Sequence, residues 1–90
     1  MSILVNIPSV LRRLTGDQKK VEIQAENMNG VIEQLENNYP GIKAHLVEDS
    51  KVHHFINIYV NDEDIRFLNE LKTVVKSGDE VTILPAVAGG

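Results

Sequence analysis

No cysteine occurs in the 90-residue chain, which excludes disulfide bonds, thiolate metal sites and a cysteine nucleophile. The absence also agrees with a reducing compartment. Basic residues are few as well, with nine Lys and Arg against thirteen Asp and Glu and a formal net charge of −4. Arg12-Arg13 and Lys19-Lys20, the only adjacent basic pairs, are interpreted as solvated surface. Because a nucleic-acid backbone requires clustered basic side chains, we expect no nucleic-acid partner.

Long apolar runs are missing too. No stretch approaches the roughly 20 residues that a membrane-spanning helix needs, and the N-terminus lacks the charged and then apolar segments of a signal peptide. We therefore expect no membrane partner and a cytoplasmic location. The length corresponds to one small domain, which we place at residues 1–85, with residues 86–90 as a flexible C-terminal tail.

Recognisable catalytic motifs are also absent. The sequence has no HExxH motif, no phosphate-binding glycine loop and no spacing that supports a Ser-His-Asp triad. His53 and His54 are expected on a strand, where neighbouring side chains point to opposite faces and cannot readily share a metal. Residues 61–64 are interpreted as a solvated turn. The chain is therefore predicted to have no metal site and not to be an enzyme.

Apolar periodicity predicts the elements that are present. Alternation predicts strands at residues 3–7, 20–24, 55–60 and 81–84, and a short strand at 65–67. Residues 28–39 have helical spacing, with apolar positions at Met28, Val31, Ile32, Leu35 and Tyr39. Asn27 is the expected N-cap and Pro40-Gly41 ends the helix. Residues 42–46 are expected to form a short helical turn, followed by a loop at 48–51.

One main helix must cover one face of a small mixed sheet, which makes this an α+β chain. A β-grasp arrangement, with the first and last strands adjacent and central, satisfies that requirement. If Val81 and Ile83 face the helix, Thr82 and Leu84 face outward. The same alternation predicts a contiguous outward apolar patch of Leu4, Phe55, Tyr59 and Leu84, with Leu68 nearby. We predict that this patch docks a partner, although scattered surface apolar residues are common.

The chain ends in Gly89-Gly90. Glycine has no Cβ, so nothing shields the terminal carboxylate and the backbone is free to bend. Val87 and Ala88 are slim enough to thread a narrow channel, and residues 86–90 reach roughly 17 Å when extended. This pattern predicts a tail that presents the Gly90 carboxylate inside another protein's active site. The alternative is a frayed terminus, which is the default for chain ends.

Two segments resemble the ubiquitin-like sulfur carriers of the ThiS/MoaD family, which include the small subunit of molybdopterin synthase and the thiazole-synthesis carrier. They are Leu11-Arg12-Arg13-Leu14-Thr15-Gly16, and Gly78-Asp79-Glu80-Val81 followed by residues 85–90. Residues 55–64 and 81–90 are similar, more narrowly, to the sulfur carriers of cysteine biosynthesis.

The resemblance implies a ubiquitin-like β-grasp fold and a defined chemistry. An E1-like adenylating enzyme would use ATP and magnesium to activate the Gly90 carboxylate, and a sulfur donor would convert it to a thiocarboxylate. A PLP-dependent cysteine synthase would then use the sulfur, and a zinc-dependent, JAMM-type peptidase would release cysteine. The carrier itself would bind no cofactor. By position, the resemblance assigns Gly89, Leu84 and Leu68 to partner contacts.

Three alternatives remain open from the sequence. The chain would instead supply sulfur for molybdopterin or thiazole, act as a protein modifier joined through Gly90 to lysines, or serve as a passive β-grasp binding module.

Overall fold

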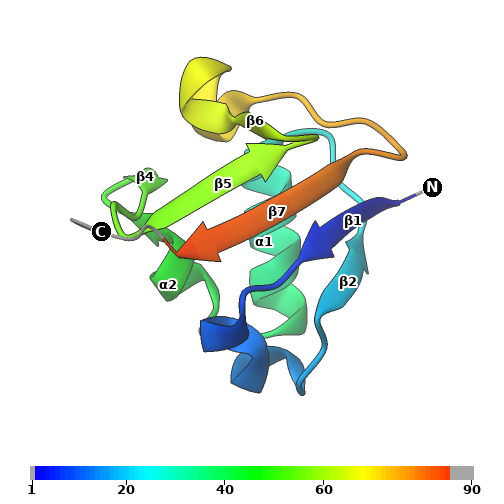
Figure 1. Ribbon diagram of the computed structural model, residues 1–90, viewed down its shortest axis with the longest axis vertical. Coiled ribbons are helices and arrows are strands. Elements are labelled where there is room, and N and C mark those ends of the chain that lie inside the picture. The colour runs from blue at the N-terminus through cyan, green and yellow to red at the C-terminus, as the bar shows by residue number, and fades with distance from the viewer. Residues whose placement is uncertain (1, 86–90) are drawn as a thin grey trace.

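The computed structural model describes residues 2–85, and the predicted tail at residues 86–90 lies outside them. A five-stranded sheet is packed on one main helix, α1 (Met28–Asn38) (Figure 1). Its strands are β1 (Ile3–Asn6), β2 (Lys20–Ile23), β5 (Ile56–Val60), β6 (Glu63–Asp64) and β7 (Glu80–Pro85). The four strands predicted at 3–7, 20–24, 55–60 and 81–84 are thus confirmed to within one residue at each end.

The strand order is β2-β1-β7-β5-β6. β1 pairs with β2 antiparallel and with β7 parallel, so that Val5 lies opposite both Val21 and Val81. β5 pairs antiparallel with β7 on its other side. The first and last strands are therefore adjacent and β7 is central, which confirms the α+β, ubiquitin-like β-grasp arrangement with a mixed sheet.

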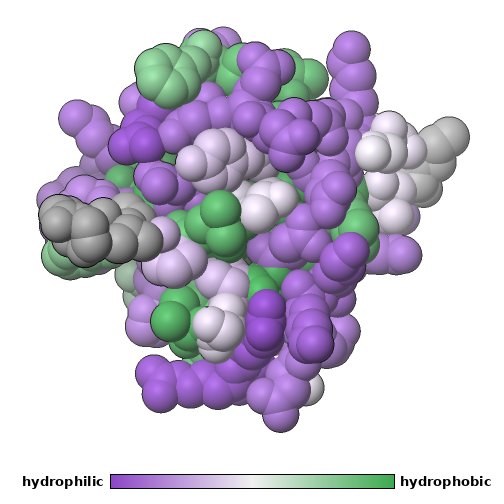
Figure 2. Space-filling model, in the orientation of Figure 1, coloured by the Kyte–Doolittle hydropathy of each residue, from purple (hydrophilic) through white to green (hydrophobic). Residues whose placement is uncertain are grey.

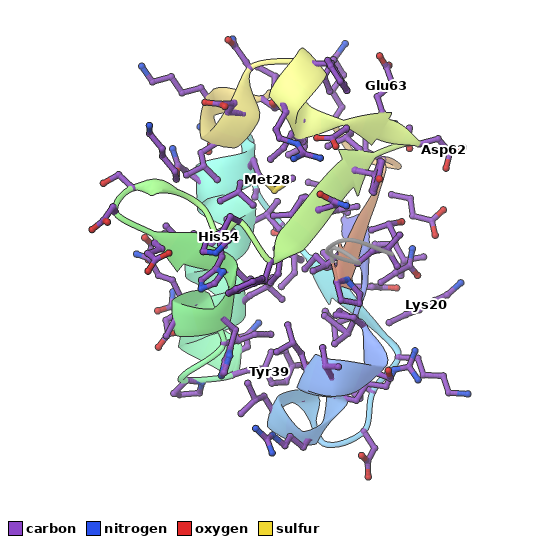
Figure 3. The ribbon with its side chains drawn as sticks, turned by 60° about the vertical axis from the view of Figure 1, so that its left-hand side comes forward. Lys20, Met28, Tyr39, His54, Asp62 and Glu63 are labelled. Atoms are coloured by element: carbon purple, nitrogen blue, oxygen red, sulfur yellow. The ribbon has the colours of Figure 1, made fainter. Side chains whose placement is uncertain are left out.

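Helix α1 begins where the sequence predicts. The Asn27 side chain accepts a hydrogen bond from the Gly30 N–H (2.8 Å), which satisfies one of the free donors of the first turn. Its buried residues are Met28, Val31, Ile32 and Leu35. They pack against the inward residues of the strands, including Val5, Ile58, Val81 and Ile83. Figure 3 shows Met28 inside, whereas Asp62 and Glu63 lie on the outside.

Residues 65–67, predicted as a strand, form a 3-10 helix instead, η2 (Ile65–Phe67). The Asp64 carboxylate caps it by accepting a hydrogen bond from the Arg66 N–H (2.9 Å). Arg66 Nη2 also donates to Asp64 Oδ2 (2.7 Å) and to Asn57 Oδ1 (2.8 Å). These local bonds favour a turn over the extended backbone that the apolar alternation indicates.

Residues 42–52 were only partly predicted. The expected helical turn is α2 (Lys43–Leu46), but the expected loop at 48–51 contains a hairpin of β3 (Val47–Glu48) and β4 (Lys51–Val52). Asp49 and Ser50 both have positive φ, 53° and 65°, as a two-residue type I′ turn requires. Residues 61–64 were interpreted as a solvated turn, but Glu63 and Asp64 form strand β6 and Asp64 is buried. The 3-10 helices η1 (Ser9–Thr15) and η3 (Glu70–Lys72) were also not predicted.

Glu36 joins the end of α1 to α2. Its carboxylate accepts hydrogen bonds from the backbone N–H groups of Lys43 (2.9 Å) and Gly41 (3.1 Å), and these bonds hold the pKa of Glu36 below its ordinary value. Among residues 2–85, no helix combines the length and the hydrophobicity that a membrane span requires.

The Asp64–Arg66 pair gives the fold a pH dependence. Hydrogen bonds from Arg66 hold the pKa of the buried Asp64 carboxyl below its ordinary value of 3.8. Because this pKa is lower in the folded than in the unfolded state, the ionised carboxylate contributes its full stabilisation at pH values above the unfolded-state pKa. That contribution is lost as the pH falls below about 3.8 and through the folded-state pKa.

We expect Asp64→Asn to lower the free energy of unfolding at neutral pH by about 1–2 kcal/mol, because the charge-assisted bonds weaken while an N-cap side chain remains. Urea unfolding of both proteins across the acid range measures the effect. The difference between wild type and variant should shrink below about pH 3.8. The exposed Asp62→Asn is the matched control; an equal loss in both variants contradicts the assignment.

Candidate partner-docking site

The central strand β7 ends at Pro85, which lies opposite Ile56 of β5. The predicted site residues Val87, Ala88, Gly89 and Gly90 lie outside the described residues. The structure shows the position of Pro85, after which these residues follow, and the surface around it. Since β7 pairs with β5 up to Pro85, the sheet fixes the position and direction of the chain at that point.

The two faces of β7 separate as predicted. Ile83 is 2% exposed and packs toward α1, whereas the next residue, Leu84, is 44% exposed on the opposite face. Thr82 is half-buried on that outward face. The predicted outward placement of Leu84 is therefore confirmed.

The predicted apolar patch is not contiguous. Leu4 lies opposite Glu80, and Tyr59 lies opposite Thr82. Tyr59 is thus a diagonal neighbour of Leu84, but Leu4 is four residues away along β7, roughly 13 Å at the rise of a strand. Figure 2, which views the sheet from the side opposite α1, shows green apolar areas separated by white and purple ones.

Polar side chains fill the space between the apolar ones. Asn6 Nδ2 donates to Glu80 Oε2 and to Thr82 Oγ1 (3.1 Å), across the parallel β1–β7 pair. This hydrogen-bonded group separates Leu4 from Leu84. The outward face is consequently amphipathic and suits a partner that contributes both apolar contacts and hydrogen bonds.

Phe55 and Leu68 are both exposed, but the structure does not bring them together on one sheet face. Phe55 lies in the turn before β5, where its ring centroid is 4.0 Å from that of His54. Leu68 follows η2 and lines a groove with Ile32 of α1 and Val52 of β4. Leu68 therefore belongs to a different surface from Leu84.

A basic groove beside the end of β7 was missed by the sequence interpretation. It is lined by Leu84 and Pro85 on one side and by Arg12, Lys19 and Lys20 among others. Its floor forms because Asn6 of β1 lies opposite both Lys20 and Thr82. The two basic pairs of the sequence thus contribute to a surface next to the tail, and the predicted strand pairing was the signal that could have located it. Its charge favours acidic side chains on a docking partner.

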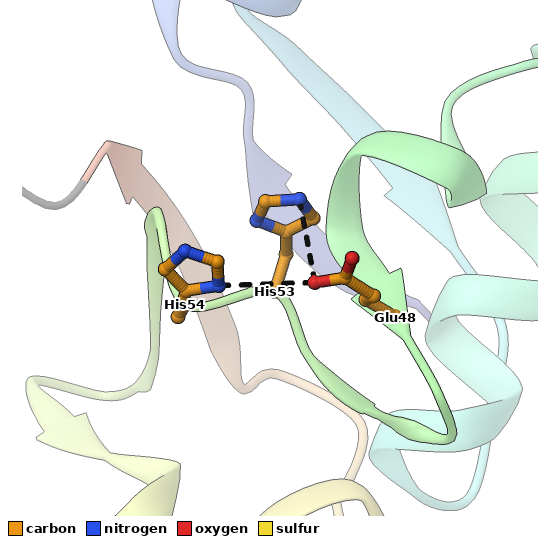
Figure 4. Close-up of side chains that lie close together, drawn as sticks. All are labelled: Glu48, His53 and His54. Atoms are coloured by element: carbon orange, nitrogen blue, oxygen red, sulfur yellow. Dashed lines mark ion pairs between the residues drawn. The ribbon is translucent and has the colours of Figure 1, made fainter.

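His53 and His54 do not have the predicted arrangement. They lie in the turn at residues 53–55 rather than on a strand, so the two rings do not point to opposite faces. Their centroids are 5.1 Å apart with planes 13° from parallel, and both rings approach the Glu48 carboxylate (Figure 4). Two imidazoles and a carboxylate are groups that can hold a metal ion.

Comparison with known proteins assigns this chain to a family. Residues 5–90 match the ThiS family. The chain is 52% identical over 93 aligned positions to the sulfur carrier protein CysO of Mycobacterium tuberculosis, with complete coverage of both sequences. Two solved structures are similar: CysO in the BexX/CysO complex of Amycolatopsis orientalis (TM-score 0.93, 51% identity, 98% of this chain and 99% of that one) and M. tuberculosis CysO (TM-score 0.91, 50% identity, 94% and 99%).

These similarities confirm the resemblance to ubiquitin-like sulfur carriers that the segments at residues 11–16 and 78–90 indicate. They extend over the full length of the chain and therefore do not rest on the C-terminal glycines alone. The chain belongs to the ThiS family.

Proposed function

We propose that this protein carries sulfur as a thiocarboxylate on Gly90 and supplies it for cysteine biosynthesis. The observation that carries the proposal is the full-length, 52% identity to a sulfur carrier protein named CysO. The terminal Gly89-Gly90 supports it, because a carrier without cysteine needs another atom to hold sulfur and the terminal carboxylate provides one. The chain then has a chemical group to offer but no catalytic machinery of its own.

The proposed loading has two steps. A carboxylate oxygen of Gly90 attacks the α-phosphorus of ATP, with magnesium bound in an E1-like partner, to form an acyl adenylate and release pyrophosphate. A sulfur donor then displaces AMP from the acyl carbon and leaves a thiocarboxylate. Adenylation is needed because a carboxylate is a poor electrophile, and the product sulfur is a strong nucleophile.

The proposed delivery uses two further partners. On a PLP-dependent cysteine synthase, the thiocarboxylate sulfur would bond to the β-carbon of an activated serine derivative, whose activated oxygen group leaves as the Cβ–O bond breaks. A shift of the acyl group from sulfur to the amino nitrogen then leaves cysteine joined to Gly90 by an amide bond. A zinc-dependent, JAMM-type peptidase then hydrolyses that bond. Each partner must accept the same slim C-terminus, which agrees with the small side chains of residues 86–90, where Val87 is the largest and Gly89 and Gly90 have no side chain.

The chain's own contribution is presentation and docking. β7 fixes the starting point of the tail, and Leu84, Tyr59 and the basic groove provide an amphipathic surface beside it. The CysO of A. orientalis has been solved in a complex with BexX, which supports a role that depends on a protein partner. The cysteine pathway is favoured over molybdopterin or thiazole synthesis because CysO is the relative matched over both full lengths at 52% identity.

The role of the terminus is tested by adding one alanine after Gly90. We expect the extended chain to lose adenylation, measured as pyrophosphate exchange with the activating enzyme, and to show no mass increase equal to the difference between sulfur and oxygen. The control carries the same alanine before Met1 and should react normally. Full activity of the C-terminally extended chain in cells would exclude both the carrier and the modifier and favour a passive module. Conjugates on target lysines would favour the modifier.

The docking face is tested by Leu84→Glu. Because Leu84 faces solvent, the variant should fold normally, yet its affinity for the activating enzyme should fall about tenfold or more, as for an interface anchor. Val74→Glu, another exposed apolar position, is the matched control and should bind normally. Ile83→Glu places a charge in the core and should unfold the protein. Unfolding of Leu84→Glu, measured by circular dichroism, would contradict the register of β7.

A further inference from the structure

We propose that Glu48, His53 and His54 form a binding site for one Zn²⁺ ion, a property that goes beyond the sulfur-carrier function and does not depend on it. Within residues 2–85, these three side chains are the group whose potential ligand atoms converge, all within 4.8 Å of one another. No predicted role in carrying sulfur accounts for this convergence.

The backbone brings the three residues together. Glu48 ends β3, and the β3–β4 hairpin returns the chain so that Val47 lies opposite Val52. The His53 N–H then donates to the carbonyl of the buried Leu46 (2.8 Å), and the His53 carbonyl accepts from the Ile56 N–H (3.0 Å). His53 is thereby tied to α2 on one side and to β5 on the other. The arrangement is held by main-chain hydrogen bonds rather than by the side chains themselves.

Two of the three distances between ligand atoms are close to those of a metal centre, and the third is at most 4.8 Å. His53 Nε2 lies 3.8 Å and His54 Nδ1 lies 3.7 Å from the same carboxylate oxygen, Glu48 Oε1 (Figure 4). With metal–ligand bonds of about 2.0–2.2 Å, two ligands of a tetrahedral zinc ion are roughly 3.4 Å apart. The two distances to Glu48 therefore need to shorten by only a few tenths of an ångström. The side chains are 56% exposed for Glu48, 70% for His54 and 22% for His53, so two of the three are free to adjust.

The donor set determines which ion fits. Two imidazole nitrogens and one carboxylate oxygen suit Zn²⁺, which accepts three protein ligands and keeps a fourth position open. Calcium and magnesium prefer oxygen ligands and are not favoured here.

Phe55 packs against both histidine rings. Its ring centroid is 4.0 Å from that of His54 and 5.2 Å from that of His53. The Phe55 N–H donates to His53 Nδ1 (3.3 Å). When Nε2 of a neutral imidazole binds a metal, its proton is on Nδ1, so this long and exposed hydrogen bond would be exchanged for the metal–nitrogen bond.

Zinc titration of the untagged, full-length chain tests the proposal, by calorimetry and by competition with a chromophoric chelator. We expect one Zn²⁺ per chain and no binding of Mg²⁺ under the same conditions. We expect zinc binding to weaken about tenfold or more in each of the variants His53→Asn, His54→Asn and Glu48→Gln. Mutating residues that only hydrogen-bond to metal ligands already has effects of that size. The exposed His45→Asn and Asp49→Asn are matched controls and should bind as the wild type does.

Location is tested by two-dimensional amide NMR of the same proteins. Added Zn²⁺ should shift resonances of residues 47–56 in the wild type and leave them unshifted in His53→Asn. Circular dichroism without metal verifies that each variant is folded. The proposal is overturned if Zn²⁺ does not bind, if binding survives all three site variants, or if the shifts centre on His45 or the N-terminus.

Discussion

The parallel pairing of β1 with β7 is the constraint on which the rest of the structure depends. It joins the beginning of the chain to its end at the centre of the sheet, with Val5 opposite Val81 and both fully buried. The Leu4 N–H also donates to the Asp79 carbonyl, and the Gly78 N–H donates to the Ser2 carbonyl. Because the contact spans nearly the whole sequence, its formation requires almost the entire chain to be in place. The end of β7 at Pro85 consequently takes its position in the sheet only when the chain is folded.

The remaining elements act as supports for that pair. Helix α1 covers the inner face of the sheet through an aliphatic surface, and β5 pairs with the second side of β7. Glu36 fixes α2 behind the helix, and α2 in turn anchors the turn that holds the two histidines through the Leu46 carbonyl. Leu84 and the basic groove lie next to the end of β7, with Leu84 on the outward face of the sheet.

The sequence was sufficient for the long periodic elements, since alternation and helical spacing are direct consequences of burying one face. Alternation identifies the face on which a residue lies but not its position along the sheet, so Leu4 and Leu84 were grouped although the register separates them. Short elements were missed for a different reason. At residues 65–67, capping by Asp64 outweighs the apolar pattern, and the turn at Asp49 and Ser50 adopts positive φ without a glycine to signal it.

The cluster of Glu48, His53 and His54 was also not predicted from the sequence. The expectation that the two rings point to opposite faces depended on treating residues 53 and 54 as strand, whereas both lie in the turn before β5, where strand alternation does not apply. For candidate site residues on strands, the sequence therefore predicted the face of the sheet but not the neighbours, and for those in turns it predicted neither.

The edges of the sheet have a consequence for self-association. β6 has only two residues, both acidic, and the opposite edge strand β2 carries exposed Lys20 and Glu22. Short, charged edges give a second chain little backbone to pair with and repel strand-to-strand stacking. The protein can therefore expose apolar side chains such as Leu84 on its sheet face without offering a route to aggregation through the edges of the sheet.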